Sequence, residues 1–243
     1  MSISSSLDQL HFKVKQNRWF GYFAIFNRIA LAAGFLPAGW VKIIGERFTD
    51  LHNDQPMGHY LEALHHTGYY YTFIGVLQVA AAVLLLIPPT ALLGALLYFP
   101  IILNITILSF AVRFEGSLLT APMMVLANLY LLCWDYDKLK FIFPFNRPPV
   151  QPELPDRKNL SKKFPTLFFG GVFATIVLYV LFITHVYNIM PRNTLPDCMT
   201  QCDDSSNPQA CEDFCDCIHN QGQPLDECLE QYKKAVEATN RKQ

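Results

Sequence analysis

Hydrophobic residues gather in five long runs, and each run is long enough to form a helix that crosses a membrane. A hydrocarbon core of about 30 Å needs about 20 mainly apolar residues in helical form. The runs are Trp19–Ile44, Gly68–Ile87, Thr90–Val112, Leu118–Trp134 and Phe164–Tyr187. Only two prolines separate the second run from the third, so these two should form a tight helical hairpin. The pattern predicts an all-α integral membrane protein.

The composition agrees with this interpretation. Hydrophobic residues make up 51% of the chain and charged residues only 16%, whereas a soluble domain has about 25% charged residues. The formal net charge of −1 gives no reason to expect a nucleic-acid partner. The first seventeen residues are mainly polar, and the apolar run that follows is too long for a cleaved signal peptide. We therefore expect the first span to remain as an anchor.

Positive charge predicts the orientation. The N-terminal segment carries Lys13, Lys15 and Arg18, and the segment between the fourth and fifth spans carries seven lysines and arginines against four acids. The positive-inside bias places both segments in the cytosol. Five crossings then bring the C-terminus outside. We expect a multi-pass protein of the bacterial inner (cytoplasmic) membrane, N-in and C-out.

These observations divide the chain into five parts. In order, they are a cytosolic N-terminus (1–18), a four-helix membrane bundle (19–134), a cytosolic Pro-rich basic linker (135–163), a fifth transmembrane helix (164–187) and an extracytosolic disulfide-rich helical tail (188–243). A proline-rich linker is extended and semi-rigid rather than helical.

Four polar residues, one from each of the first four spans, fall at a similar depth. These are Arg28, Gln78, Asn104 and Asn128. Counted at about 1.5 Å per residue from the cytosolic ends, they share one layer roughly 13–21 Å deep, and no acid lies at that depth. An arginine at a helix centre costs about 2.5–3.5 kcal/mol on insertion, so it should face inward towards the amides.

Two interpretations of this intramembrane polar layer remain open. The amides could join packed helices, each contributing about 0.6 kcal/mol on average. Alternatively, the layer could form a pocket in which Arg28 meets a polar or anionic group such as a quinone carbonyl or a lipid phosphate.

A second polar cluster is expected at the outer face, where spans end. It includes Lys42, Glu62 and Glu115. Between the first two spans, His59, Glu62 and His66 fall on one face of a short predicted helix, where imidazole and carboxylate could bind a divalent metal. The solvated face of an interfacial helix explains the same spacing, so we expect no metal there.

Six of the seven cysteines lie in the last forty-six residues. An even and dense set is typical of a small domain that disulfides stabilise in an oxidising compartment, which agrees with an outside C-terminus. Three short helices are predicted here, at Asp197–Cys202, at Pro208–His219 and from Pro224 to about Ala238.

The cysteine spacing favours one pairing among the fifteen that six cysteines permit. Each Cys-x3-Cys pair lies on one helix face, and an antiparallel hairpin brings the two pairs into register. The expected disulfides are Cys198–Cys215, Cys202–Cys211 and Cys217–Cys228.

Other uses of these cysteines are weaker alternatives. His219 could join them around zinc, and Cys215-Asp216-Cys217 could exchange disulfides. Cys133, at the cytosolic end of the fourth span, is expected to be reduced and buried.

The first span also resembles the opening signature of the DoxX family. The segment Arg28-Ile-Ala-Leu-Ala-Ala-Gly-Phe-Leu-Pro-Ala-Gly-Trp-Val-Lys42, followed by Phe48, has the arginine, glycine and lysine that precede a short outer loop in that pattern. Gly75-Val-Leu-Gln78 lies where many members have a glycine-rich stretch with a glutamate, so Gln78 departs from the family by replacing the acid. The resemblance covers about residues 20–140 and implies a compact four-helix membrane bundle. Members are linked to quinone-coupled sulfur oxidation and to thiol-redox complexes, generally as small subunits.

Taken together, the sequence favours a small accessory subunit of a membrane complex, which the resemblance links to quinone or thiol redox chemistry. We found no haem ligand pair, phosphate loop or nucleophile–base set, so we expect no enzyme activity by this chain alone and no evident cofactor other than a quinone. The expected partners are membrane lipid and a membrane or periplasmic protein. One alternative is a non-catalytic scaffold that docks a periplasmic partner through its acidic tail, which has ten acids against five bases from Asn188 onward. The other is a bundle that binds a lipid or small molecule.

Overall fold

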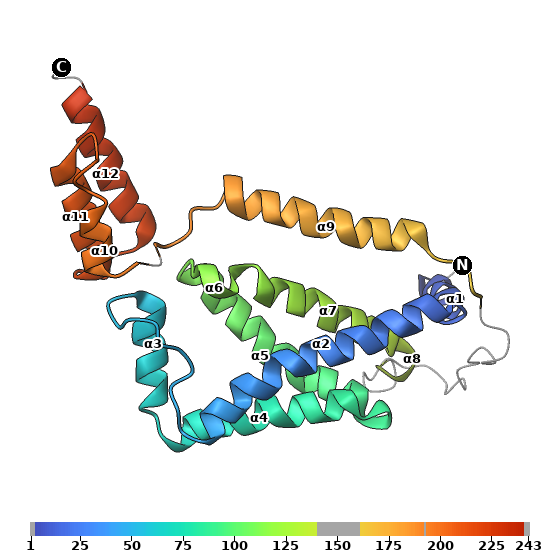
Figure 1. Cartoon of the computed structure of the whole chain (residues 1–243). Helices are drawn as coiled ribbons and strands as arrows, with labels where there is room; N and C mark the ends of the chain where they lie inside the picture. The colour runs from blue at the N-terminus through green and yellow to red at the C-terminus, as the bar shows by residue number, and fades with distance from the viewer. Residues whose placement is uncertain (1–2, 140–160, 192, 241–243) are drawn as a thin grey trace.

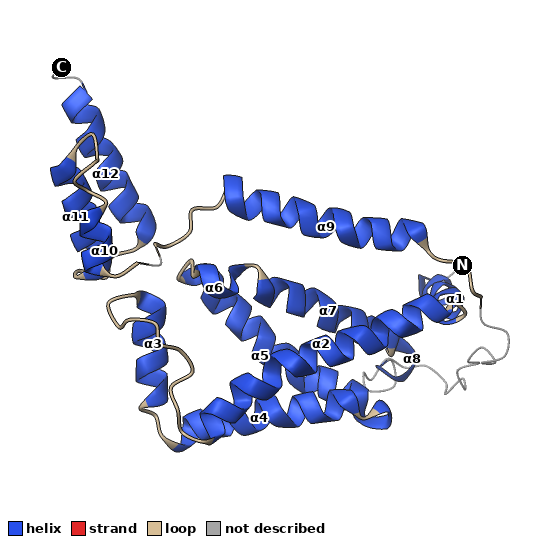
Figure 2. Cartoon of the chain, in the orientation of Figure 1, coloured by secondary structure: helices blue, strands red, loops and turns tan. Residues whose placement is uncertain are grey.

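A computed structural model describes residues 3–139, 161–191 and 193–240, and every regular element within these ranges is a helix (Figure 2). Five helices are long and apolar enough to cross a membrane. They are α2 (Arg18–Ile43), α4 (Tyr69–Leu86), α5 (Ala91–Ala111), α7 (Thr120–Trp134) and α9 (Thr166–His185). Their ends lie within two residues of the five apolar runs, so the predicted set of long helices is confirmed.

Shorter helices mark the two ends of the bundle (Figure 1). At one end lie α1 (Ile3–Lys15), α8 (Tyr136–Leu139) and the turn η1 (Pro88–Thr90) between α4 and α5. We call this end the α1 face. At the opposite end lie α3 (Pro56–His65), α6 (Glu115–Leu118) and the tail helices α10 (Leu195–Thr200), α11 (Pro208–His219) and α12 (Leu225–Asn240). We call this end the tail face.

Small residues allow the first two long helices to approach closely. A Cβ atom on Gly39 would lie 2.7 Å from the Gly75 carbonyl oxygen, and a Cβ atom on Gly75 would lie equally close to the Gly39 oxygen. Helices in membranes associate through such backbone contacts because lipid supplies little hydrophobic driving force between them. Ala81 and Leu85 of α4 and Tyr98 of α5 are fully buried and belong to the core of the bundle.

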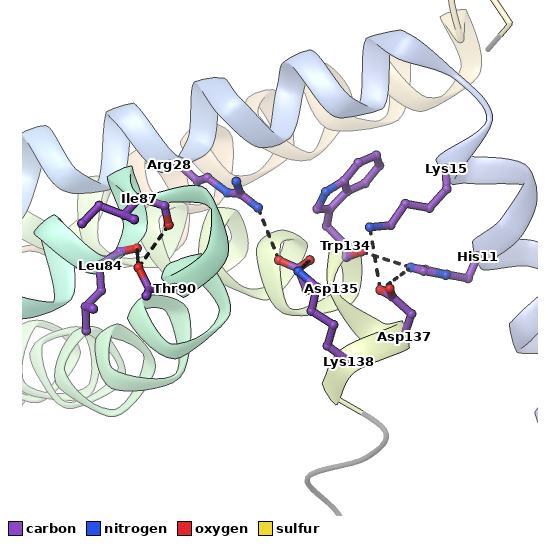
Figure 3. Close-up of polar contacts among 10 residues, drawn as sticks. All are labelled: His11, Lys15, Arg28, Leu84, Ile87, Thr90, Trp134, Asp135, Asp137 and Lys138. Atoms are coloured by element: carbon purple, nitrogen blue, oxygen red, sulfur yellow. Dashed lines mark hydrogen bonds and ion pairs between the residues drawn. The ribbon is translucent and has the colours of Figure 1, made fainter. Parts of the chain in front are cut away.

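The hairpin of α4 and α5 is equally tight. A Cβ atom on Gly94 would lie 2.6 Å from the backbone nitrogen of Leu85. At the turn, the Thr90 hydroxyl donates to the carbonyl oxygens of Leu84 and Ile87, at 3.0 and 3.1 Å (Figure 3). The side chain therefore satisfies carbonyl groups that the end of α4 leaves without helical partners.

The fifth long helix, α9, runs along the outside of the bundle (Figure 1). Near its start, Phe168 packs edge-on against Phe20 with ring centroids 4.8 Å apart. Near its end, the Tyr179 hydroxyl donates to the Leu118 carbonyl oxygen, and Ile183 is buried. Most other side chains of α9 are exposed and apolar, as expected for a helix that faces lipid.

Two cytosolic segments were predicted, at 1–18 and at 135–163. The N-terminal segment, expected only to be polar and cytosolic, contains the helix α1, which exposes Leu10 and Phe12. The greater part of the predicted Pro-rich linker, residues 140–160, lies outside the described residues. Its end is held in place, because Ser161 exchanges backbone hydrogen bonds with Gln16 and Arg18.

Candidate functional site

The intramembrane arginine pairs with an acid that the depth count did not place near it. Arg28 Nη2 donates to Asp135 Oδ2 at 3.3 Å, and Lys138 Nζ lies 3.0 Å from the other oxygen (Figure 3). Asp135 directly follows α7 and is only 3% exposed. The expectation that no acid is available to Arg28 was wrong, because the depth count assumed that all spans begin at the same level. The start of α2 instead crosses the end of α7, where Gly21 faces the Trp134 ring.

The other members of the predicted layer do not join Arg28. Gln78 packs beside Gly39, which lies about 16 Å from Arg28 along the axis of α2. Asn128 is fully buried and its Nδ2 donates to the Ala95 carbonyl oxygen at 3.0 Å, so it links α7 to α5. Asn104 is exposed on α5. The structure therefore supports the interhelical role for Asn128, and it pairs Arg28 with Asp135 rather than with one of the amides.

A second ion-pair cluster attaches α1 to the bundle. Asp137 Oδ1 lies 3.7 Å from Lys15 Nζ and 3.8 Å from His11 Nε2, and His11 Nε2 is also 3.1 Å from the Trp134 carbonyl oxygen (Figure 3). Burial lowers the pKa of Lys15 because it disfavours the charged ammonium, although Asp137 acts in the opposite direction.

The predicted outer-face cluster is not assembled either. Lys42 is buried; its Nζ donates to the Ala38 carbonyl oxygen at 2.9 Å and lies 4.0 Å from the centre of the Phe48 ring. Glu62 pairs with other residues, and Glu115 is exposed at the start of α6. Among the residues that the structure describes, these three form no ion pair with one another.

The candidate metal ligands on and beside α3 either form ion pairs within the chain or are exposed. Arg47 Nε lies 2.9 Å from Glu62 Oε2, and His66 Nε2 lies 2.8 Å from Glu62 Oε1. His59 is exposed. Both Glu62 oxygens thus already have partners within the chain, which leaves the weak candidate set His59, Glu62 and His66 without a free carboxylate.

Three disulfides join the tail helices. They are Cys198–Cys215, Cys202–Cys211 and Cys217–Cys228, with Cα–Cα distances of 5.9, 5.4 and 5.9 Å, and they are the pairs that the spacing predicts. The sulfurs of Cys202, Cys211 and Cys215 lie close enough together for a metal. Because all three are in disulfides, they offer no thiolate ligands. The zinc and disulfide-exchange alternatives therefore lack free thiols here.

Cys133 differs from its prediction. It is a free cysteine, but its side chain is exposed on α7 rather than buried. Only one face of α7 packs into the bundle, and position 133 lies on the other face.

Local sequence explains why the tail helices begin where they do. Thr194 and Asp197 form a capping box at α10, and the Asn207 side chain accepts from the Ala210 backbone N–H at the start of α11. Hydrogen bonds from Thr194 lower the pKa of Asp197 because they favour the carboxylate. Hydrogen bonds from the side chains of Asn220 and Gln221 lower the pKa of Asp216, at the other end of α11.

Arg113 fastens the tail to the bundle. Its Nη2 donates to Asp226 Oδ2 at 2.5 Å, its Nη1 donates to the Asn188 carbonyl oxygen at 3.2 Å, and its guanidinium carbon lies 4.9 Å from the centre of the Tyr187 ring. Its carbonyl oxygen accepts from the Met190 backbone N–H at 2.9 Å. Arg113 has a φ of 52°, a left-handed conformation that bulky residues rarely adopt, and these contacts stabilise it.

A second attachment joins the tail to the loop before α3. Gln55 Nε2 donates to the carbonyl oxygens of Pro191 and Asn193, at 3.1 and 2.5 Å. Asp54 Oδ2 accepts from the Leu195 backbone N–H at 3.3 Å and lies 3.6 Å from His219 Nδ1. The His219 side chain is fully buried, and this burial lowers its pKa, although Asp54 acts to raise it.

The tail carries more acidic than basic side chains, and several of its carboxylates are exposed. Six exposed carboxylates form no ion pair with any residue in the described ranges: Asp203, Asp204, Glu212, Asp213, Glu227 and Glu237. We call this set the acidic surface. Cys198–Cys215 and Cys202–Cys211 join the segment around α10 to α11, and Cys217–Cys228 joins α11 to α12, so all three bridges hold the segments that carry these carboxylates.

Sequence reasoning missed the residues that attach the tail. Asp54, Gln55 and Arg113 lie in loops, where no periodicity indicates a partner more than a hundred residues away. The only local signal was the Gln55-Pro56 dipeptide, which is typical of a helix start and which indeed begins α3.

The fold and these attachments define a multi-pass helical membrane protein that carries a disulfide-bonded helical domain on one end. No family model and no solved structure matches the chain. Over 81 residues it is 40% identical to the uncharacterized protein YwoB of Bacillus subtilis (strain 168). The match covers 33% of this chain and 51% of that protein, so it spans about half the length of the relative.

Proposed function

We propose that this protein is a small accessory subunit of a membrane complex and that its acidic surface docks a basic protein partner. The carrying observation is the double attachment of the tail, through Arg113 and through Asp54 with Gln55. A tail that served only as a folded C-terminal cap would not need to be held at two points on the bundle. Held in this way, it presents the acidic surface at a constant height above the tail face.

Charge complementarity supports a basic partner. The acidic surface contains six carboxylates with no ion pair in the described chain, and complementary charge speeds association and selects among partners. The disulfides also keep the tail rigid, so that less conformational entropy is lost when a partner binds.

The orientation belongs to the same proposal. The positive-inside bias and the disulfides both support a tail outside the cytosol, and in a bacterium we propose an inner-membrane protein with a periplasmic tail. The DoxX resemblance of the first span would link the complex to quinone or thiol redox chemistry. The tail does not support the thiol branch of this link, since Cys215 and Cys217 are buried in disulfides.

Photo-crosslinking in living cells tests the proposal. A photoreactive amino acid placed at Glu212 or Glu227 should capture one partner protein, whereas the same label at Leu167, which is 91% exposed on α9, should not. Replacing Asp203 and Asp204 by lysine should reduce the adduct from position 212, because repulsion replaces attraction. The disulfides should remain intact in the variant. The proposal fails if the adduct is insensitive to this charge reversal or forms equally from Leu167.

Topology is tested separately. A reporter fused to the C-terminus that is active only outside the cytosol should be active, and a fusion after Ser161 should be inactive. A cytosolic C-terminus would contradict the placement of the docking surface.

A further inference from the structure

A groove of about 580 Å³ opens on the α1 face, where the end of α1 meets the start of α2 and the end of α7. Three cationic side chains line it, from Lys15, Arg18 and Arg28, and among the described residues no acid lines it. The wall also includes Trp134 and the apolar surface of Tyr22 and Ile25. The groove is at the opposite end of the bundle from the acidic surface, so it is independent of the docking proposed above.

Buried carboxylates behind the wall hold two of these cations in position. Asp137 lies 3.7 Å from Lys15 Nζ, and Asp135 accepts from Arg28 Nη2 at 3.3 Å. Both acids are almost fully buried, so the attraction acts in surroundings of low dielectric constant. Lys15 is further fixed by the Trp134 ring, whose centre is 4.2 Å from its Nζ. The cations therefore do not need to be ordered when a ligand arrives.

Donor groups remain unused in this arrangement. Arg18 forms no ion pair within the described ranges, and the Nε of Arg28 is buried without a hydrogen-bond partner. A guanidinium carries five N–H donors in a planar fork that suits phosphate oxygens. An anion with several oxygens in the groove would accept from the free donors of Arg18 and balance the excess of positive charge.

The apolar half of the groove indicates the form in which that anion arrives. Tyr22 and Ile25 are 58% and 52% exposed on the outer side of α2, so an acyl chain could lie against them while its headgroup reaches Arg18. α1 exposes Leu10 and Phe12, which suits a helix lying at the membrane surface. Trp134 and Tyr22 are residues of the kind that gather at headgroup depth.

We propose that this groove binds the phosphate headgroup of an anionic phospholipid in the membrane leaflet on the α1 face. The shared chemistry is that of a phosphate ester, which a soluble metabolite could also supply. The apolar wall favours the lipid, because a soluble phosphate ester would leave Tyr22 and Ile25 uncovered.

Native mass spectrometry of the full-length protein, released from detergent with equal amounts of phosphatidylglycerol and phosphatidylcholine, tests this proposal. Phosphatidylglycerol should be retained preferentially. Arg18→Gln and Lys15→Gln should each weaken its binding about fivefold to tenfold, since each removes a cationic hydrogen-bond donor that faces the phosphate. Arg18 is the sharper variant because its loss leaves no buried acid unpaired in the described chain.

Lys13→Gln is the matched control, because it removes the same charge from an exposed position of α1 outside the groove. It should leave binding unchanged. The proposal is overturned if Lys13→Gln weakens binding as much as Arg18→Gln, or if both lipids are retained equally. Binding of glycerol phosphate is the final comparison. If it binds the protein as tightly as the lipid does, the ligand is a soluble phosphate ester rather than a phospholipid, and the proposal is wrong.

Discussion

Arg113, which lies two residues after the end of α5, donates a hydrogen bond to Asp226 of α12 across a sequence separation of 113 residues. Asp226 is 69% exposed at its side chain, while that of Arg113 is only 20% exposed. The arginine is therefore part of the bundle surface, and the aspartate reaches down to it from the tail. This contact is one of the two attachments that join the membrane part of the chain to its disulfide-bonded domain; the other runs through Asp54 and Gln55.

Replacing Arg113 by alanine should loosen the tail without unfolding the bundle. The change removes a partly exposed ion pair and a contact with the Tyr187 ring, which together contribute about 1–2 kcal/mol. Hydrogen exchange at α12 should then rise roughly 5- to 30-fold. Lys233→Ala, an exposed change on the same helix, is the control. Equal exchange in the two variants would show that Arg113 does not hold the tail.

The attachment at α3 should weaken as the pH falls. Burial holds the pKa of His219 below its ordinary value of 6.5, so the docked tail favours the neutral ring. Above about pH 6.5 the ring is neutral in both states and the contribution is fully present. Below that value the released tail binds a proton more readily, and stability is lost as the pH approaches the lowered pKa.

Hydrogen exchange of α11, corrected for intrinsic rates, should therefore increase between pH 7.5 and pH 5. His219→Gln should remove much of this dependence, whereas the exposed His59→Gln should retain it. A pH response that survives in the His219 variant would assign it to other groups, of which Asp54 is the nearest at 3.6 Å.

Asp135→Asn should destabilise the bundle strongly. It leaves the guanidinium of Arg28 without its carboxylate, and removing one partner of a buried pair costs about 3–5 kcal/mol. Combining it with Arg28→Gln should recover much of the loss, because the uncompensated charge is then gone. Thermal unfolding in detergent measures both. Asp137→Asn is the comparison and should cost less, since its contacts with Lys15 and His11 are longer.

Gly39→Ala should separate α2 from α4. The added methyl group would lie 2.7 Å from the Gly75 carbonyl oxygen, and overpacking of this kind costs about 1–3 kcal/mol. Gly170→Ala, in α9, meets nothing within 4 Å and should leave the unfolding temperature almost unchanged. Similar shifts for the two variants would mean that the close approach of the helices contributes little.

Removing one nested disulfide should affect the tail alone. Changing both Cys202 and Cys211 to serine should cost about 2–5 kcal/mol of tail stability, while helices α2, α4, α5 and α7 keep their packing. Proteolysis of the tail, compared with thermal unfolding of the bundle, separates the two effects. Non-reducing peptide mapping of the unaltered protein should recover the three bridges. Any other connectivity would remove the structural basis of the acidic surface.

The local features of this chain were predictable because they depend on short-range patterns. Apolar runs of about 20 residues determine the five long helices, since backbone groups in lipid must be paired within the helix. The Cys-x3-Cys spacing indicated the bridges of the tail, because residues four apart lie on one helix face.

What only the tertiary structure decided is where helices cross and which distant groups then meet. Arg28 lies at the end of α7 rather than in a layer with Gln78 and Asn128, because α2 crosses that end at Gly21 instead of starting at the same depth. A hydropathy pattern records how long each span is, but not its tilt or its crossing point. The same holds for Asp54 and Arg113: their partners come from the far end of the chain, and only packing brings them together.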